Sequence, residues 1–161
     1  MDTAARWHLF AKMIEKRTII FGLCLWLASP SLAVAAGAGL LPYRSAVDVA
    51  AGKQIYDSQC AACHGAALEG QANWRIRDEE GYLPAPPHDA TGHTWHHPDA
   101  QLFAIVKYGI EALVGNGYKS QMGGYGDTLS DQEIAQVLAY IKSTWPEPVI
   151  AQHNLINQRA D

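Results

Sequence analysis

The sequence predicts an all-α domain, and three observations carry this prediction. Residues Ser130 to Glu133 have the order Ser-Asp-Gln-Glu, a capping box that opens a helix, and apolar residues follow at helical spacing up to Trp145. A second apolar run at helical spacing follows Asp48, a favourable N-cap residue, and continues to Tyr56. The 161 residues contain no alternating strand pattern and no internal repeat. We therefore expect packed helices and no sheet.

Local signals place the remaining elements. Pro98 and Asp99 begin a short helix, because proline fits the first turn and an acidic side chain stabilises a helix N-terminus. Gly109 ends this helix. The stretch from Gly115 to Gly126 holds five glycines without a regular period and is predicted to be a loop. Gly52 lies inside the first helix, where glycine is about 1 kcal/mol less favourable than alanine, so we expect another helix to approach it closely.

Residues 1–35 are predicted to be a secretory signal peptide. Basic residues precede an uncharged apolar run that starts at Thr18, and Ala33-Val34-Ala35 offers a small-residue cleavage site. An uncleaved membrane anchor is the alternative, since no charged residue occurs from Thr18 to Leu41. The expected organisation is a signal peptide at 1–35, a linker at 36–47, a domain at 48–146, and a polar tail at 147–161 that is extended or a frayed helix.

Charge and cysteine content narrow the function classes. The formal net charge is −4, and loss of the basic leader would leave a more acidic chain, which argues against binding to nucleic acid or to an anionic membrane. One of the three cysteines, Cys24, lies in the predicted leader. The two others, Cys60 and Cys63, are too few for a structural disulfide network. We expect the exported part to reside in the periplasm.

The stretch Cys60-Ala61-Ala62-Cys63-His64 is typical of a covalent c-type haem attachment site. At this spacing both sulfurs leave one helical turn and can meet the two vinyl groups of a porphyrin, while His64 presents an imidazole to the iron. A zinc site would need two further ligands at matched spacing. A thioredoxin-like redox pair would need a βαβ pattern, which the sequence lacks. The sequence therefore predicts one haem c, held by Cys60 and Cys63.

Met122 is the candidate for the second axial ligand. It is the one methionine outside the predicted leader, and it follows His64 by 58 residues in the glycine-rich loop before the last helix. Thioether sulfur stabilises ferrous iron and raises the reduction potential. A core-filling methionine is the alternative, but the neighbours Gln121 and Gly123 fit it poorly. A histidine ligand or an open iron position also stays possible.

A cluster of histidines follows a proline-rich segment. Leu83-Pro84-Ala85-Pro86-Pro87 is too rich in proline for a helix interior, and its carbonyls can accept the Nδ1–H of His64, which leaves Nε2 free for iron. Four histidines come next: His88, His93, His96 and His97. They form either a second metal site, an alternative haem ligand, or a polar loop beside the haem. Pro98 keeps His97 out of helical geometry, so His93 and His97 are not a helical metal pair.

These motifs together resemble the class I cytochromes c, the bacterial monohaem carriers and their mono- and dihaem variants. The resemblance covers most of residues 48–145, through Gly52 and Tyr56, the attachment motif, the methionine loop and a last helix containing Val137-Leu138-Ala139-Tyr140-Ile141. It implies a fold in which the first and last helices cross, with Gly52 and Tyr56 meeting Val137 and Tyr140. The chain departs from the family pattern in a long insert around residues 71–98 and in the tail after Trp145.

The resemblance implies a periplasmic electron carrier rather than an enzyme. Its iron would be held by His64 and Met122 and would transfer single electrons. Expected donors are a membrane quinol-oxidising complex or a dehydrogenase, and expected acceptors are a terminal oxidase or reductase, met through small transient contacts. Two alternatives remain open from the residues. One is a peroxidase or gas-binding haem protein with an open or bis-histidine iron, and the other is a copper- or zinc-binding module built on the histidine cluster.

Overall fold

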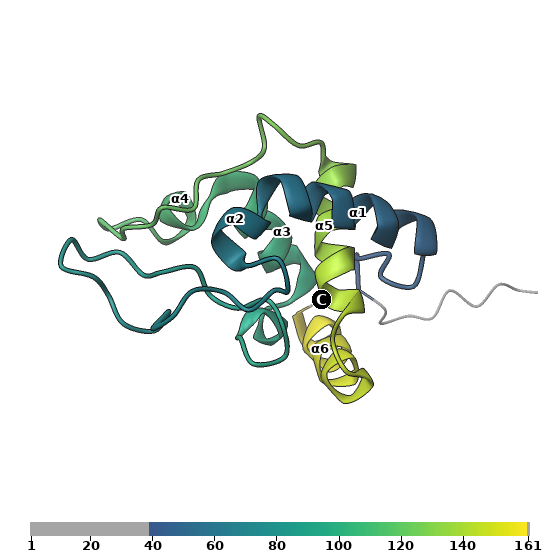
Figure 1. The fold of residues 1–161 in the computed structure, drawn as a ribbon. Helices are drawn as coiled ribbons and strands as arrows, with labels where there is room; N and C mark the ends of the chain where they lie inside the picture. Colours follow the sequence, from purple (N-terminus) through teal and green to yellow (C-terminus); the bar gives the residue numbers. More distant parts are fainter. Residues whose placement is uncertain (1–38, 161) are drawn as a thin grey trace, which may run out of the picture. The chain divides into compact units, whose positions relative to one another are not determined.

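The computed structural model describes residues 39–160, and within that range the chain is helical without strands, as predicted (Figure 1). The elements in order are α1 (Ala46–Gln59), α2 (Ala61–His64), the 3₁₀ helix η1 (Thr94–His96), α3 (Asp99–Tyr108), α4 (Ile110–Val114), α5 (Asp131–Ser143) and α6 (Glu147–Ala160). The predicted signal peptide lies outside the described residues. No helix from residue 39 to residue 160 is long and apolar enough to cross a membrane.

Helices α1 and α5 cross at Gly52 (Figure 1). A Cβ atom added to Gly52 would collide with the backbone carbonyl oxygen of Gln136 and lie 3.0 Å from the Cβ of Tyr140. The Tyr56 and Tyr140 rings pack beside this point with their centroids 5.4 Å apart. The glycine is therefore required by the close approach of two backbones, which confirms the expectation from the sequence.

The start of α1 differs from the prediction. Ser45, rather than Asp48, is the N-cap, and its hydroxyl accepts a hydrogen bond from the Asp48 N–H at 3.4 Å. The Asp48 carboxylate instead accepts a hydrogen bond from the Gln136 side chain of α5 at 2.9 Å. Both residues are favourable N-caps. The Asp48 side chain, in the first turn of α1, therefore bonds to α5 instead of capping α1.

Residues 41–45 do not form the linker that we expected. Leu41 and Tyr43 are buried among the core residues, and the Leu41 N–H donates to the Asp99 carboxylate at 3.3 Å. The segment therefore belongs to the folded domain and leads directly into α1. The two buried apolar residues of this stretch, Leu41 and Tyr43, were the signal for this packing.

Helix α5 is the centre of the core. Its capping box forms as predicted, because the Ser130 hydroxyl accepts from the Glu133 N–H and the Glu133 carboxylate accepts from the Ser130 N–H. The apolar stripe of α5 is buried, with Ile134 fully inaccessible and Val137 2 % exposed. Burying each such side chain contributes about 1.5–3 kcal/mol. Other core residues come from every part of the described chain: Leu41, Tyr56, Leu68, Leu102, Leu129, Trp145 and Ile150.

The expected extended or frayed tail is instead the 14-residue helix α6. It buries Ile150, His153 and Asn157 and contacts η1. The boundary predicted at residue 146 therefore precedes a helix that packs on the domain. Two of the three buried side chains are polar, which is why hydrophobic periodicity did not reveal this face.

Two long loops extend from the helical core on the same side of α5 in Figure 1. We call residues 65–97, which link α2 to α3 and include η1, the proximal segment, and residues 115–129 the methionine loop. The loops meet away from the core: the Lys119 ammonium donates to the Glu80 carbonyl at 2.7 Å, and the Arg77 guanidinium lies 5.1 Å from the Tyr118 ring centroid. As predicted, α3 ends at Gly109, whereas the short helix α4 was not predicted.

Candidate haem site

The two attachment cysteines flank a single helical turn. Cys60 lies between α1 and α2, and Cys63 and His64 lie within α2. Cys60 is half-buried and Cys63 is exposed. Burial, with a smaller contribution from neighbouring Cys63, raises the pKa of the Cys60 thiol to about 11. A thioredoxin-like pair requires a lowered thiol pKa, so the environment of Cys60 argues against that alternative.

The His64 imidazole is oriented by the proline-rich segment. Its ring is 7 % exposed, and its Nδ1–H donates to the carbonyl oxygen of Pro86 at 2.9 Å. This is the type of hydrogen bond that the sequence predicted. Because Nδ1 carries the proton, Nε2 keeps its lone pair for a metal. Burial lowers the pKa of His64, against a smaller opposite effect of the Pro86 carbonyl, and thus favours the neutral imidazole that binds iron.

Backbone hydrogen bonds hold Pro86 in place. The Gln71 N–H donates to the Ala85 carbonyl at 2.9 Å, and the Ala85 N–H donates back to the Gln71 side-chain oxygen at 2.8 Å. The backbone of Gly70 approaches the Pro86–Pro87 peptide so closely that an added Cβ would collide with it. The carbonyl that orients His64 is therefore fixed by a fold-back of the proximal segment on itself.

The four clustered histidines separate into different aromatic contacts. The His88 ring stacks on His64, His93 stacks on Trp74, and His96 packs edge-on against Trp95. His97 approaches the His93 ring edge-on at 5.4 Å. Within residues 39–160, no three or more His, Cys, Asp or Glu side chains are grouped so that they could hold a metal ion. The described residues thus give no support to the copper or zinc module.

Met122 lies in the methionine loop and is half-buried. Its N–H donates to the Ser120 hydroxyl at 3.0 Å, and the two glycines that follow it pack closely against Gly109. Tyr125 connects this loop to the attachment motif, because its hydroxyl donates to the carbonyl of Gln59 at 3.1 Å. The structure thus brings Cys60, Cys63 and His64 into one turn and links the loop of Met122 to the residue before Cys60.

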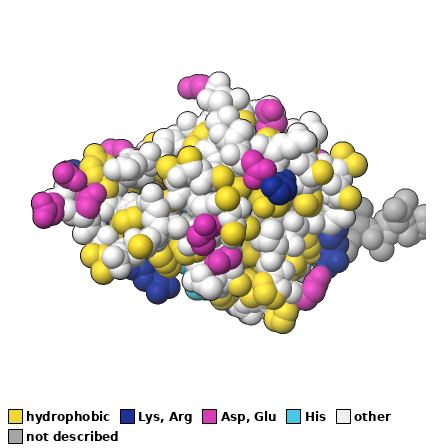
Figure 2. Space-filling view, in the orientation of Figure 1, with side chains coloured by type: hydrophobic (Ala, Val, Ile, Leu, Met, Phe, Trp, Pro, Cys, Tyr) yellow, Lys and Arg dark blue, Asp and Glu magenta, His cyan; other side chains and the backbone are white. Residues whose placement is uncertain are grey.

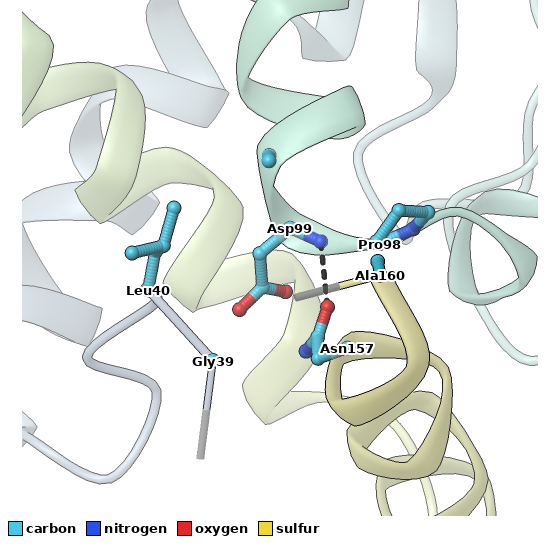
Figure 3. A pocket seen from close by; sticks show the side chains of 7 residues that line it. Gly39, Leu40, Pro98, Asp99, Asn157 and Ala160 are labelled. Carbon is cyan, nitrogen blue, oxygen red and sulfur yellow. Dashed lines mark hydrogen bonds between the residues drawn. The ribbon is translucent and has the colours of Figure 1, made fainter. Parts of the chain in front are cut away.

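A buried polar cluster formed by side chains of α3, α5 and α6 was missed by sequence reasoning. Lys142 is fully inaccessible, its ammonium lies 3.7 Å from an Asp99 carboxylate oxygen, and that oxygen lies 3.4 Å from His153 Nε2. The Asp99 N–H also donates to Asn157 at 2.8 Å (Figure 3). Burial lowers the pKa of Lys142, against the opposing effect of Asp99. Lys142 follows Leu138 by four residues, so its position on the apolar stripe was the available signal.

A small cavity of about 50 Å³ lies beside this cluster, where residues Gly39 and Leu40 meet α3 and α6 (Figure 3). Asp99 and Asn157 line it, and none of the predicted haem residues does. The cavity has room for a few water molecules and is no candidate for a cofactor site.

The cytochrome c family model matches residues 49–145. The chain belongs to the cytochrome c family. Its haem c is therefore attached through the two thiols of the motif, Cys60 and Cys63, whose spacing and single-turn geometry fit the porphyrin. The helical fold and the crossing of α1 and α5 agree with this membership.

Similar curated proteins include a cytochrome c6, a nitrite reductase and an oxidase subunit. The chain is 34% identical over 97 residues to cytochrome c6 of Tetradesmus obliquus, which covers 58% of this chain and 88% of that protein. It is 30% identical over 128 residues to a nitrite reductase of Stutzerimonas stutzeri, covering 80% of this chain and 21% of the reductase. It is 24% identical over 111 residues to the cbb3-type cytochrome c oxidase subunit FixP of Sinorhizobium medicae, covering 68% of this chain and 34% of the subunit.

The chain thus spans about a fifth of the nitrite reductase and about a third of FixP. No solved structure matches the chain significantly. Family membership establishes an electron-transfer haem protein.

Proposed function

We propose that this cytochrome c carries single electrons with a six-coordinate haem iron, held by His64 on one face and Met122 on the other. The observation that carries this proposal is the orientation of His64: its ring is buried in the attachment turn, its Nδ1–H is bound by Pro86, and its Nε2 is available. The half-buried Met122 supports the second ligand, since its loop is tied to the attachment turn through Tyr125. Haem supplies the reversible one-electron step.

The chain's own residues define the environment of that step. The Pro86 carbonyl holds the Nδ1 proton, which fixes the tautomer and increases electron donation from His64. The proximal segment and the methionine loop meet at Lys119 and Glu80 and would limit access of water to the haem. With His64 and Met122 both bound to it, the iron would exclude small ligands and would keep the same ligands in both oxidation states.

We place the protein in the periplasm, either free after cleavage at Ala35 or anchored by its N-terminal segment. Proposed donors are a membrane quinol-oxidising complex or a dehydrogenase, and proposed acceptors are a terminal oxidase or reductase. The similarity to a nitrite reductase and to an oxidase subunit supports acceptors of this class and a role as an accessory subunit. On the face shown in Figure 2, acidic and basic side chains are scattered among apolar ones. The negative net charge of the chain suits a partner with basic side chains around its docking site.

Carbon monoxide binding tests this proposal. Carbon monoxide is added to the reduced, exported holoprotein, and the absorption spectrum is recorded before and after addition. A six-coordinate iron predicts an unchanged spectrum in the parent and a carbon monoxide complex in Met122→Ala. A parent that binds the gas stoichiometrically would instead have an open iron position, as in a peroxidase or gas-binding protein.

A further inference from the structure

The His88 ring lies face to face with the His64 ring. Their centroids are 4.0 Å apart and their planes differ by 21°. His88 lies 24 residues after His64 and reaches it because the proline-rich segment folds back across the attachment turn. His88 therefore stacks on the imidazole ring of His64, whose Nε2 would bind the iron.

Contacts from three parts of the fold hold His88. Its N–H donates to the Leu68 carbonyl at 2.8 Å, and its own carbonyl accepts from the Trp145 indole N–H at 2.8 Å. Trp145 is 4 % exposed and follows α5, so the core itself positions the His88 backbone. The Tyr56 ring of α1 meets the His88 ring edge-on, with centroids 6.4 Å apart. The ring position is therefore determined by the fold rather than by a mobile surface loop.

A hydroxyl also fixes the rotation of the His88 ring. His88 Nδ1 lies 2.8 Å from the Thr94 hydroxyl, which is buried and donates its hydrogen to the Pro87 carbonyl at 3.4 Å. Since the single hydroxyl proton is engaged by Pro87, Thr94 accepts from the Nδ1–H of His88. Both imidazoles are thus tied through Nδ1 to adjacent carbonyls, His64 directly to Pro86 and His88 through Thr94 to Pro87.

We propose that His88 is a positioning residue for the axial ligand: its ring, fixed by Thr94, stacks on His64, sets the plane in which that imidazole meets the iron, and stabilises the ferric state. This inference rests on the proposed function in one respect, the ligation of iron by His64. The physical basis is twofold. Groups behind a ligating histidine orient its ring and tune the metal. An aromatic face also interacts favourably with the positive charge that the ferric haem shares with its imidazole.

Four variants separate stacking from polarity. His88→Leu removes the aromatic face, and His88→Phe retains it while removing the polar atoms. Thr94→Val frees the His88 ring from its hydroxyl anchor, and Thr94→Ser keeps that anchor. His96→Leu is the matched control, because His96 is an exposed histidine of the same segment that packs on Trp95 instead.

The readouts are the reduction potential of the holoprotein and the electron paramagnetic resonance spectrum of its ferric form, which reports the orientation of the imidazole plane. We expect His88→Leu to raise the potential and to broaden the ferric signal, because several ring orientations become populated. His88→Phe keeps the aromatic face but loses the bond to Thr94, so it should shift both readouts less than His88→Leu does, and His96→Leu should stay close to the parent. Thr94→Val should change both readouts in the direction of His88→Leu, and Thr94→Ser should restore them.

Unchanged readouts in His88→Leu would overturn the inference, and so would equal shifts in His88→Leu and His88→Phe, since polarity alone would then explain the effect. If His88→Leu does not yield holoprotein, Thr94→Val and Thr94→Ser are compared instead. Unchanged readouts in Thr94→Val would then overturn the inference. The parent spectrum separately tests the proposed ligation, because a parent without a low-spin histidine-ligated signal would refute the function proposed above before any variant is compared.

Discussion

The proximal segment and the methionine loop would face the same haem, but the structure holds them in different ways. His64 is fixed through its side chain, by the Pro86 carbonyl on one edge and by the His88 ring on one face. Met122 is fixed through its backbone, by the Ser120 hydroxyl and by the packing of the next two glycines on Gly109. The side chain of His64, the proposed ligand on one face, is therefore oriented by fixed partners, whereas the position of the proposed ligand Met122 depends on how its loop closes.

This difference extends to the surroundings of each segment. The proximal segment is anchored to the core at two further points, since Trp145 donates to His88 and His153 Nε2 donates to the His97 carbonyl at 2.9 Å. The methionine loop is anchored at its end, where the Tyr125 and Gly126 N–H groups donate to carbonyls of α3. Its contacts with the proximal segment come from exposed side chains such as Lys119, which are worth little individually.

The largest effect is expected when the covalent connection on the proximal side is removed. In Cys60→Ser/Cys63→Ser the two thioether bonds cannot form, so we expect no haem to remain on the polypeptide after denaturing electrophoresis and haem staining. Cys24→Ser is the control, because Cys24 lies outside the family match and should leave the stain unchanged. Retained stain in the double variant would show that Cys60 and Cys63 are not the attachment residues.

The next effect concerns the helix crossing on which both segments are built. In Gly52→Val the new side chain would collide with the Gln136 carbonyl, and overpacking of this kind destabilises a fold by about 1–3 kcal/mol or more. Urea unfolding of the ferric holoprotein measures the loss. Gly123→Ala is the control, since an added Cβ there has open space and the expected change is within about 0.5 kcal/mol. Equal stability of the two variants would contradict the close crossing.

The hydrogen bond from His153 to the His97 carbonyl, which anchors the proximal segment to α6, predicts a pH effect. Burial, together with the nearby Lys142 charge and against the opposing Asp99 charge, lowers the pKa of His153, so the folded protein favours the neutral ring. The contribution of the neutral His153 ring to the free energy of unfolding is fully present above the ordinary histidine pKa of about 6.5. It is lost as the pH falls from there towards the lowered pKa of the folded protein, by at most about 1.4 kcal/mol per pH unit.

The variant His153→Gln tests this effect, because glutamine keeps a donor for the His97 carbonyl and does not titrate. The free energy of unfolding of the parent should fall more steeply below pH 6.5 than that of His153→Gln. Urea unfolding at several pH values gives both slopes. Identical slopes would show that His153 does not contribute to the acid sensitivity of the fold.

The smallest effect is expected on the methionine side. Lys119→Met removes the hydrogen bond to Glu80, which should ease opening of the methionine loop and increase the affinity of the ferric iron for added cyanide about two- to five-fold. Spectral titration measures this affinity. Lys53→Met is the control, because Lys53 is an exposed lysine of α1 paired with Asp57. An equal change in both variants would mean that the contact between the loops does not restrain Met122.

Much of the fold followed from short-range patterns. The capping box at Ser130 and the ends of α3 depend on residues a few positions apart, and sequence reasoning placed them correctly. The glycine at the helix crossing was identified because a glycine inside a helix needs a reason. The Pro86 hydrogen bond was anticipated because a proline-rich segment leaves its carbonyls free to accept.

The features that sequence reasoning missed depend on distant partners. Helix α6 was expected to be extended or frayed because its buried face includes His153 and Asn157, whose partners Asp99 and His97 lie more than fifty residues away. The stacking of His88 on His64 depends on the fold-back of the proximal segment, which no local pattern specifies. Polar residues satisfied across the core are invisible to a search for apolar periodicity.

The most direct test of the account is the optical spectrum of the exported ferric holoprotein beside that of Met122→Ala. Ligation by Met122 predicts a weak far-red charge-transfer band from sulfur to ferric iron in the parent and its absence from the variant. A parent without this band, or a variant that retains it, would contradict ligation by Met122. The proposal of a six-coordinate electron carrier with His64 and Met122 on its iron would then fail.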